Sequence, residues 1–190
     1  MEVTFMSGNN TDTLRRMVYA ALFGALTAMG AFMVIPMQPV PITLQTLFTG
    51  LAGILLGSSA GALSQVVYVL LGIIGLPVFA GGKAGFGVLL GPTGGYLIGF
   101  IMGAYVIGKM SEFRPNSAYL WLPITLVAGN LVMYTVGTIQ LMMATHLSLN
   151  KALLIGVFPF LPGDIFKLLA AIWIAFKLRK YFPLGGKILS

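Results

Sequence analysis

The chain contains no cysteine, and histidine occurs once, at His146. Without thiols, disulfides, iron–sulfur clusters and thiolate zinc sites are excluded, and a lone histidine does not favour a metal site. Charge is also scarce, because 190 residues include 11 Lys and Arg and 4 Asp and Glu, and positions 17 to 82 hold no charged side chain. We therefore expect neither a metal nor a cofactor.

The acidic residues are too few for the constellations that enzymes use, and none of them pairs with another in a catalytic arrangement. A glycine-rich stretch at residues 81–84 resembles the end of a phosphate-binding loop, but Ala84 stands where Ser or Thr would hold magnesium. We predict that the chain is not an enzyme and does not hydrolyse ATP itself.

Most residues of the chain are apolar. A hydrophobic share of 58% and a mean hydropathy of +0.97 exceed the share of about 45–50% in soluble domains. A membrane-spanning helix needs about 20 apolar residues. Between tails at residues 1–13 and 183–190, we predict an all-α integral membrane protein with six transmembrane helices in residues 14–182. The expected segments are residues 14–35, 43–56, 60–74, 93–110, 119–145 and 162–181.

The basic residues predict the orientation of these segments. Cytoplasmic loops carry an excess of Lys and Arg, so both termini are predicted to be cytoplasmic and the net charge of +7 does not indicate nucleic-acid binding. Lys83 and Lys151 then lie outside, Lys167 lies within a span, and residues 36–42 and 75–91 form outer loops. The predicted cytoplasmic side holds Arg15, Arg16, Lys109, Arg114, Lys177, Arg179, Lys180 and Lys187.

Asp164 and Lys167 lie in the last segment, three residues apart on one helix face. A charge within a span costs about 2.5–3.5 kcal/mol, so such a residue is a functional-site hypothesis. Pro162 and Gly163 begin the helix, and its first turn favours an anion. We predict an outward-facing pocket in which one group accepts and the other donates a hydrogen bond to a small ligand such as a cyclic urea. The alternative is a neutralised structural pair.

Other side chains are candidates to line this pocket, although each could instead be a packing residue. Three stand at segment entries, and two lie four residues apart on one helix face. The aromatic residues Phe79 and Phe86 of the second outer loop could cover an apolar ligand body. The polar candidates are Thr43, Gln45, Tyr96, Asn130 and Tyr134.

The first segment carries small residues at helical spacing. Ala20, Gly24 and Ala28 form one stripe, with Ala21 and Ala25 beside it. Such stripes let helices approach closely within membranes. They indicate either packing inside the bundle or a docking face for another membrane subunit.

Three stretches resemble, in the same order, the motifs of a known family. Residues 75–82 (GLPVFAGG) and 91–96 (GPTGGY) resemble the signature of BioY proteins, which are the biotin-binding S components of energy-coupling factor (ECF) transporters. Residues 162–167 (PGDIFK) resemble the C-terminal motif of that family, and residues 39–46 (PVPITLQT) resemble its first loop. The similarity extends over about residues 14–182.

The resemblance implies a biotin-uptake protein of the bacterial cell membrane with six helices and an outward-facing pocket. It implies a transmembrane scaffold subunit and two ATPase subunits as partners, with the first helix on the scaffold. Asp164 and Lys167 would meet the N–H and C=O groups of the ureido ring, and Lys83 or loop amides near Gly82 would hold the carboxylate, with Lys167 as the rival. Biotin is then the transported ligand and not a cofactor.

A different class of transporter is the main alternative. In a proton-coupled secondary transporter of a small polar solute, Asp164 and Lys167 would relay a proton. Such a protein would be driven by a pH gradient and would need neither ATP nor partner subunits.

Overall fold

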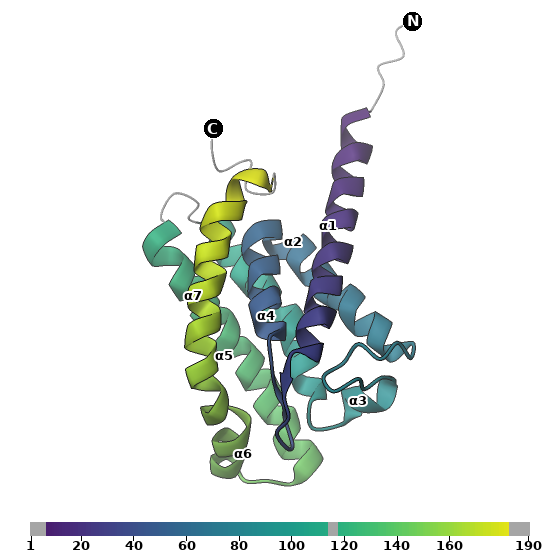
Figure 1. Cartoon of the computed structure of the whole chain (residues 1–190), viewed down its shortest axis with the longest axis vertical. Helices are drawn as coiled ribbons and strands as arrows, with labels where there is room; N and C mark the ends of the chain where they lie inside the picture. The colour runs from purple at the N-terminus through teal and green to yellow at the C-terminus, as the bar shows by residue number, and fades with distance from the viewer. Residues whose placement is uncertain (1–6, 114–117, 183–190) are drawn as a thin grey trace, which may run out of the picture.

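The computed structural model describes residues 7–113 and 118–182, and almost all of its regular structure is helical (Figure 1). In chain order the elements are α1 (Ser7–Phe32), β1 (Val34–Ile35), β2 (Ile42–Thr43), α2 (Gln45–Ile73), α3 (Phe86–Leu90), α4 (Gly94–Phe113), α5 (Ala118–Thr145), α6 (Leu149–Gly156), the 3-10 turn η1 (Phe158–Phe160), α7 (Leu161–Leu178) and the 3-10 turn η2 (Arg179–Tyr181).

Helix α2 is a helical hairpin that supplies two of the predicted spans. Gly57 interrupts it with a φ of 81°, a left-handed conformation that favours glycine. The Gln45 amide bonds the Tyr68 hydroxyl at 2.5 Å although the residues are 23 positions apart, which is about 34 Å along a straight helix. The two halves are therefore antiparallel. Together with α1, α4, α5 and α7 they make six helices, which confirms the predicted fold class and the turn at Gly57.

The turn at Gly57 is held by the end of α4. The carboxylate of Glu112 accepts hydrogen bonds from the backbone N–H of Ser58 at 2.6 Å and from its hydroxyl at 3.0 Å. These bonds satisfy an unpaired N–H at the start of the second half of α2, where the helix dipole also favours an anion. Glu112 therefore stabilises the hairpin turn.

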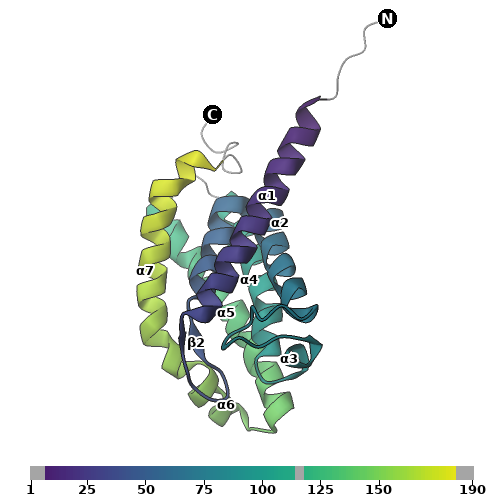
Figure 2. The same cartoon turned by 45° about the vertical axis from the view of Figure 1, so that its right-hand side comes forward.

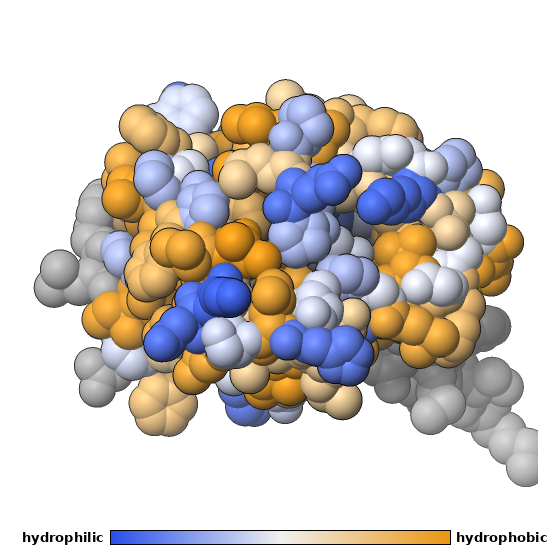
Figure 3. Space-filling model, turned by 90° about the horizontal axis from the view of Figure 1, so that it is seen from below, coloured by the Kyte–Doolittle hydropathy of each residue, from blue (hydrophilic) through white to orange (hydrophobic). Residues whose placement is uncertain are grey.

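The two ends of the bundle differ in construction. The start of α1 and the end of α7 lie at one end, whereas the β1–β2 hairpin, α3 and α6 gather at the other, which we call the loop end (Figures 1 and 2). Seen from below, the loop end shows hydrophilic residues scattered among apolar ones (Figure 3). The predicted outer loops, residues 36–42 and 75–91, thus share one end of the molecule.

Three short elements were not predicted from the sequence. The first outer loop closes as an antiparallel hairpin with Val34 opposite Thr43, the second outer loop contains α3, and α6 precedes α7. The extended backbone of Ser148 (φ −68°, ψ 156°) is typical of a residue that begins a helix. Helix α1 also begins earlier than the predicted first segment, at Ser7.

The exterior of the bundle is apolar, as a membrane requires. Within the described ranges, Trp121–Thr145 and Leu149–Leu178 are helical stretches long and apolar enough to span a membrane, and the two halves of α2 (Gln45–Ile73) are comparably apolar. On α7, Phe166 is 74% exposed and Trp173 is 61% exposed. Large apolar side chains on an outer surface are stable in lipid, so the chain is an integral membrane protein.

Candidate functional site

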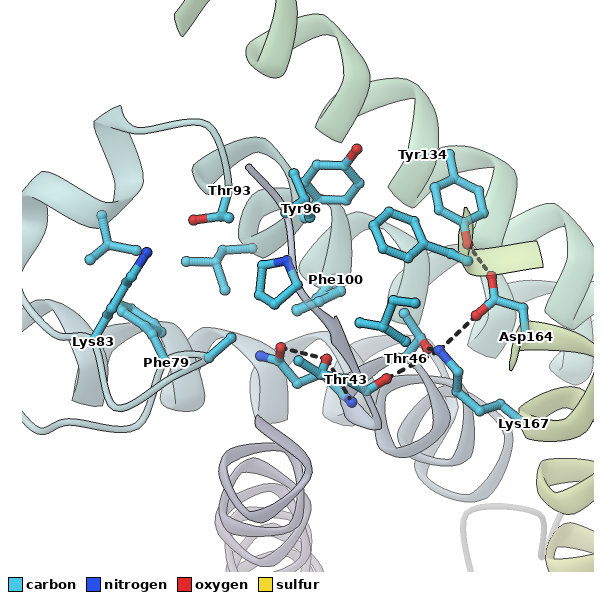
Figure 4. A pocket seen from close by; sticks show the side chains of 18 residues that line it. Thr43, Thr46, Phe79, Lys83, Thr93, Tyr96, Phe100, Tyr134, Asp164 and Lys167 are labelled. Carbon is cyan, nitrogen blue, oxygen red and sulfur yellow. Dashed lines mark hydrogen bonds and ion pairs between the residues drawn. The ribbon is translucent and has the colours of Figure 1, made fainter. Parts of the chain in front are cut away.

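A cavity opens between the helices near the loop end. It encloses about 670 Å³ of space between atoms, open solvent at its mouth included. Figure 4 shows charged groups on opposite sides of it and aromatic rings between them. The lining residues are Val40, Pro41, Ile42, Thr43, Gln45, Thr46, Phe79, Ala80, Lys83, Val88, Thr93, Tyr96, Leu97, Phe100, Tyr134, Phe160, Asp164 and Lys167.

One side of the cavity holds the buried ion pair that the sequence predicted. Lys167 Nζ lies 2.7 Å from Asp164 Oδ1, and the two residues are 9% and 4% exposed. The Tyr134 hydroxyl donates a hydrogen bond to Asp164 Oδ2. Asp164 falls in the first turn of α7, where the helix dipole adds to its stabilisation as an anion. Asp164 therefore contacts α5 through Tyr134 and its own helix through Lys167.

The two members of the pair differ in their spare hydrogen-bonding capacity. Besides Asp164, the Lys167 ammonium donates to the main-chain oxygen of Thr43 at 3.1 Å and to the Thr46 hydroxyl at 3.0 Å. An ammonium has three N–H donors, so Lys167 has none left, whereas a carboxylate has about four acceptor positions. Two of these are occupied by Tyr134 and Lys167. Asp164 can therefore accept hydrogen bonds from a ligand without losing a partner.

The opposite side of the cavity carries a single positive charge. Lys83 is exposed, and no carboxylate in the described ranges pairs with it. Its backbone oxygen accepts from the N–H of Phe79 at 3.0 Å, which closes a short turn that presents the side chain at the cavity mouth. This site suits an anionic group that reaches the mouth.

Aromatic and aliphatic side chains connect the two sides. The rings of Tyr134 and Phe160 are parallel with centroids 6.3 Å apart, and Tyr96 meets Phe160 edge-on at 6.5 Å. The Tyr96 hydroxyl donates to the main-chain oxygen of Gly156 at 2.7 Å. Tyr96 therefore contributes its ring, and not its hydroxyl, to the lining of the cavity. Phe100 and Leu97 of α4 extend this apolar wall. A ligand with an apolar middle and polar ends fits this lining.

The structure brings most of the predicted residues together. Asn130 does not line the cavity but a groove between α5 and α7, because it lies one turn further from the mouth than Tyr134. Gly82 is also outside the lining and lies in the exposed turn beside Lys83, with a φ of 73°. Phe86 is exposed and outside the lining as well. The residues placed at the cavity are Thr43, Gln45, Phe79, Lys83, Tyr96, Tyr134, Asp164 and Lys167.

Several lining residues were missed from the sequence. Thr93 and Phe100 lie three residues before and four after Tyr96, so helical spacing around Tyr96 could have found them. Thr46 follows Thr43 by three residues, where the chain enters α2. No sequence pattern indicated Phe160 as a lining residue, because its position depends on the 3-10 turn η1, which was not predicted.

The small residues of α1 divide between two surfaces. Ala20, Gly24 and Ala28 are buried against the bundle, and a side chain at Gly24 would lie 2.9 Å from the main-chain oxygen of Ser64. This stripe is packed inside the bundle and is closed to another subunit. Ala21 and Ala25 are exposed, so a docking face remains a prediction for these two residues.

The fold and the cavity define a helical membrane protein with a cavity that opens near the loop end. The model of the BioY family matches residues 4–184. "Biotin transporter BioY" of Thermotoga maritima is 44% identical over 167 residues, 88% of this chain and 97% of that protein. "Biotin transporter BioY" of Rhizobium etli is 36% identical over 180 residues, 90% and 96% of the two chains. The chain therefore belongs to the BioY family, as the sequence motifs predicted.

A solved structure agrees with this assignment. The crystal structure of the S-component for biotin from an ECF-type ABC transporter superposes with a TM-score of 0.83 and 31% sequence identity. The match covers 93% of this chain and 95% of that chain. The prediction of a transport protein, and not an enzyme, is confirmed by the family.

Proposed function

We propose that this protein captures biotin with high affinity and takes it up as the substrate-binding S component of an ECF transporter. The observation that carries the proposal is the Asp164 carboxylate, which is buried in the cavity, fixed by Tyr134 and Lys167, and still able to accept hydrogen bonds. A buried, aligned acceptor selects a ligand with N–H donors, because a ligand lacking them would leave the carboxylate unsatisfied. The biotin transporters among its relatives support the choice of ligand.

The cavity suggests how biotin would lie. Asp164 accepts from the ureido N–H groups, and the sulfur ring and tail lie along Phe100, Leu97 and Phe160. Lys167 is a poor partner for the carboxylate because Asp164 already neutralises it and all its donors are engaged. Lys83, on the opposite side (Figure 4), pairs with no carboxylate among the described residues, so we assign the carboxylate to Lys83. Lys167 reaches the ureido oxygen only by releasing one of its three present acceptors.

The orientation follows from the distribution of charge. Arg15, Lys109 and Lys177 belong to the end of the bundle where α1 begins and α7 ends, whereas Lys83 and Lys151 belong to the loop end (Figure 1). The positive-inside rule then places both termini in the cytoplasm and the cavity mouth outside, in a bacterial plasma membrane.

Uptake then proceeds by capture, docking and release. Biotin enters from outside, and residues 36–42 and 75–91 close over it. The loaded protein docks through the exposed Ala21 and Ala25 face of α1 on a transmembrane scaffold subunit, where small residues allow close approach. Two ATPase subunits supply the energy, and the chain itself needs no cofactor.

The pattern of buried charge argues against proton coupling. Asp164 and Lys167 are the only buried charged side chains in the part of the chain that the structure describes. A relay across the membrane needs further charged groups along the path, and no other buried charged side chain continues from this pair among those residues. Proteoliposomes that hold this chain alone test the alternative: a pH gradient should drive no biotin uptake.

The first experiment is equilibrium biotin binding to the detergent-purified chain and to its Asp164→Asn variant. We expect tight binding by the wild type and a loss of at least about tenfold, or 1.4 kcal/mol, in the variant. Asp12→Asn is the matched control, because Asp12 is exposed near the start of α1, and it should bind normally. No binding by folded wild-type protein would overturn the proposal.

A further inference from the structure

A buried tyrosine outside the cavity joins the two loops at its mouth. Tyr68, in the second half of α2, is 0% exposed and does not line the cavity. Its hydroxyl accepts a hydrogen bond from Gln45 Nε2 at 2.5 Å and donates one to the main-chain oxygen of Val78 at 3.1 Å. Gln45 begins α2, directly after the β1–β2 hairpin, and Val78 belongs to the second outer loop. One hydroxyl therefore connects the two.

The same chain of hydrogen bonds reaches the ion-pair side of the cavity. Gln45 Oε1 accepts from the Thr43 hydroxyl at 2.8 Å, and the main-chain oxygen of Thr43 accepts from Lys167 Nζ at 3.1 Å. Each group donates toward the next, from Lys167 through Thr43, Gln45 and Tyr68 to Val78. Thr43, Gln45 and Tyr68 are buried, where hydrogen bonds are strengthened and a missing partner is costly.

Val78 leads into the turn that carries Lys83. The Phe79 ring meets the Tyr68 ring edge-on with centroids 5.7 Å apart. The Phe79 N–H donates to the Lys83 oxygen at 3.0 Å, and the Gly82 N–H donates to the Phe79 oxygen at 2.9 Å. These two hydrogen bonds stabilise residues 79–83, which we call the Lys83 turn. Tyr68 contacts this turn through its ring and contacts the preceding residue, Val78, through its hydroxyl.

Helix α2 shapes a second contact with the Lys83 turn at Gly72. A side chain at Gly72 would collide with the Phe79 ring, so the absence of one lets the ring pack onto the helix. The Gly72 oxygen also accepts from the N–H of Gly85 at 2.7 Å, just past the turn. The turn is therefore placed by α2 from two sides, through Tyr68 and through Gly72.

We propose that Tyr68 is a positioning residue for the carboxylate of the ligand. Its hydroxyl fixes Val78, Val78 sets the place of the Lys83 turn, and the turn sets the distance from the Lys83 ammonium to the ligand. Tyr68 thereby fixes the position of the Lys83 side of the cavity relative to the ion-pair side, because the same chain of hydrogen bonds continues to Lys167. The inference rests on the proposed function, since it assumes that Lys83 meets the biotin carboxylate.

The test compares two ligands on the purified, detergent-solubilised chain. Biotin carries the carboxylate, and biotin carboxamide has the same rings and tail without the charge. In Tyr68→Phe we expect biotin to bind about tenfold more weakly and the carboxamide to change by less than about twofold, which are 1.4 and 0.4 kcal/mol. Tyr105→Phe is the matched control, because this tyrosine is 47% exposed on α4, and neither ligand should be affected.

A merely structural role would give a different result. If Tyr68 only stabilises the fold, Tyr68→Phe lowers the melting temperature but leaves the ratio of the two affinities unchanged, which would overturn the inference. Gly72→Ala is the second variant, and it tests the inference if Tyr68→Phe does not fold. It displaces Phe79, which also lines the cavity, without touching the hydroxyl, so biotin is expected to lose more affinity than the carboxamide, and an unchanged ratio would again overturn the inference.

The two proposals fail separately. A folded wild-type protein that binds neither ligand would overturn the proposed function. Wild-type protein that binds biotin, with a selective loss in Lys83→Met but not in Tyr68→Phe or Gly72→Ala, would overturn only the role of Tyr68.

Discussion

The two sides of the cavity recognise charge by different physical means. Asp164 and Lys167 are buried, neutralise each other and have fixed partners in Tyr134, Thr43 and Thr46. Lys83 is exposed and pairs with no carboxylate among the described residues, and a backbone turn fixes its position. A buried pair gives directional selection because unsatisfied groups are costly there. An exposed single charge gives attraction that water and salt weaken.

The largest expected effect comes from breaking the buried pair. Lys167→Met leaves the Asp164 carboxylate buried without its counter-charge, which costs about 3–5 kcal/mol. We expect a large drop in the melting temperature in detergent together with loss of biotin binding. The double variant Asp164→Asn/Lys167→Met removes both charges and should recover much of the stability but not the binding. A Lys167→Met variant as stable as the wild type would show that Lys167 does not stabilise the Asp164 carboxylate.

The next effect concerns the exposed side. Lys83→Met should weaken biotin binding by about fivefold to tenfold, because it removes a charge-assisted hydrogen bond, and should leave the melting temperature unchanged. Calorimetry with biotin and its carboxamide measures this selectivity. The matched control is Lys151→Met, since Lys151 is exposed on α6 and outside the cavity lining. Equal losses for the two ligands would remove Lys83 from the carboxylate site.

An effect smaller than that of Lys167→Met is expected from loosening the buried side without removing charge. Thr46→Val deletes one of the three acceptors of Lys167, and a lost hydrogen bond of this kind costs about 1–3 kcal/mol. The melting temperature should fall less than in Lys167→Met, and biotin affinity should fall less than in Asp164→Asn. The measurement is thermal unfolding of the three variants side by side. A Thr46→Val variant as unstable as Lys167→Met would contradict this order.

The smallest effect needs no mutation. Raising the salt from about 0.1 M to 1 M shortens the Debye length from about 10 Å to 3 Å, which should weaken biotin binding modestly. The carboxamide should bind independently of salt, because its remaining polar contacts lie at the buried side. Titrations of both ligands at the two salt concentrations make the comparison. Salt sensitivity shared by both ligands would place an exposed charge at the buried side.

Much of the fold and part of the site could be predicted from the sequence. Apolar segments punctuated by proline, glycine and charge predicted the six helices, and the turn at Gly57 was correct because the Gly-Ser-Ser run ends an apolar segment. Asp164 and Lys167 were found because charge inside an apolar helix is costly. Asn130 lies outside the cavity lining, because helical spacing predicts a shared face but not how far along the helix the cavity extends.

By itself, the sequence determined the membrane class, the family and the charged residues of the site. These properties depend on composition, local spacing and motif order, which are contained in the chain. The tertiary structure alone decided that Lys167 has no free donor, that Thr46 and Phe160 reach the cavity, and that Tyr68 joins the two loops. The reason is physical: hydrogen-bond saturation and cavity shape depend on groups far apart in sequence, such as Thr43 and Lys167, whose contact no local pattern encodes.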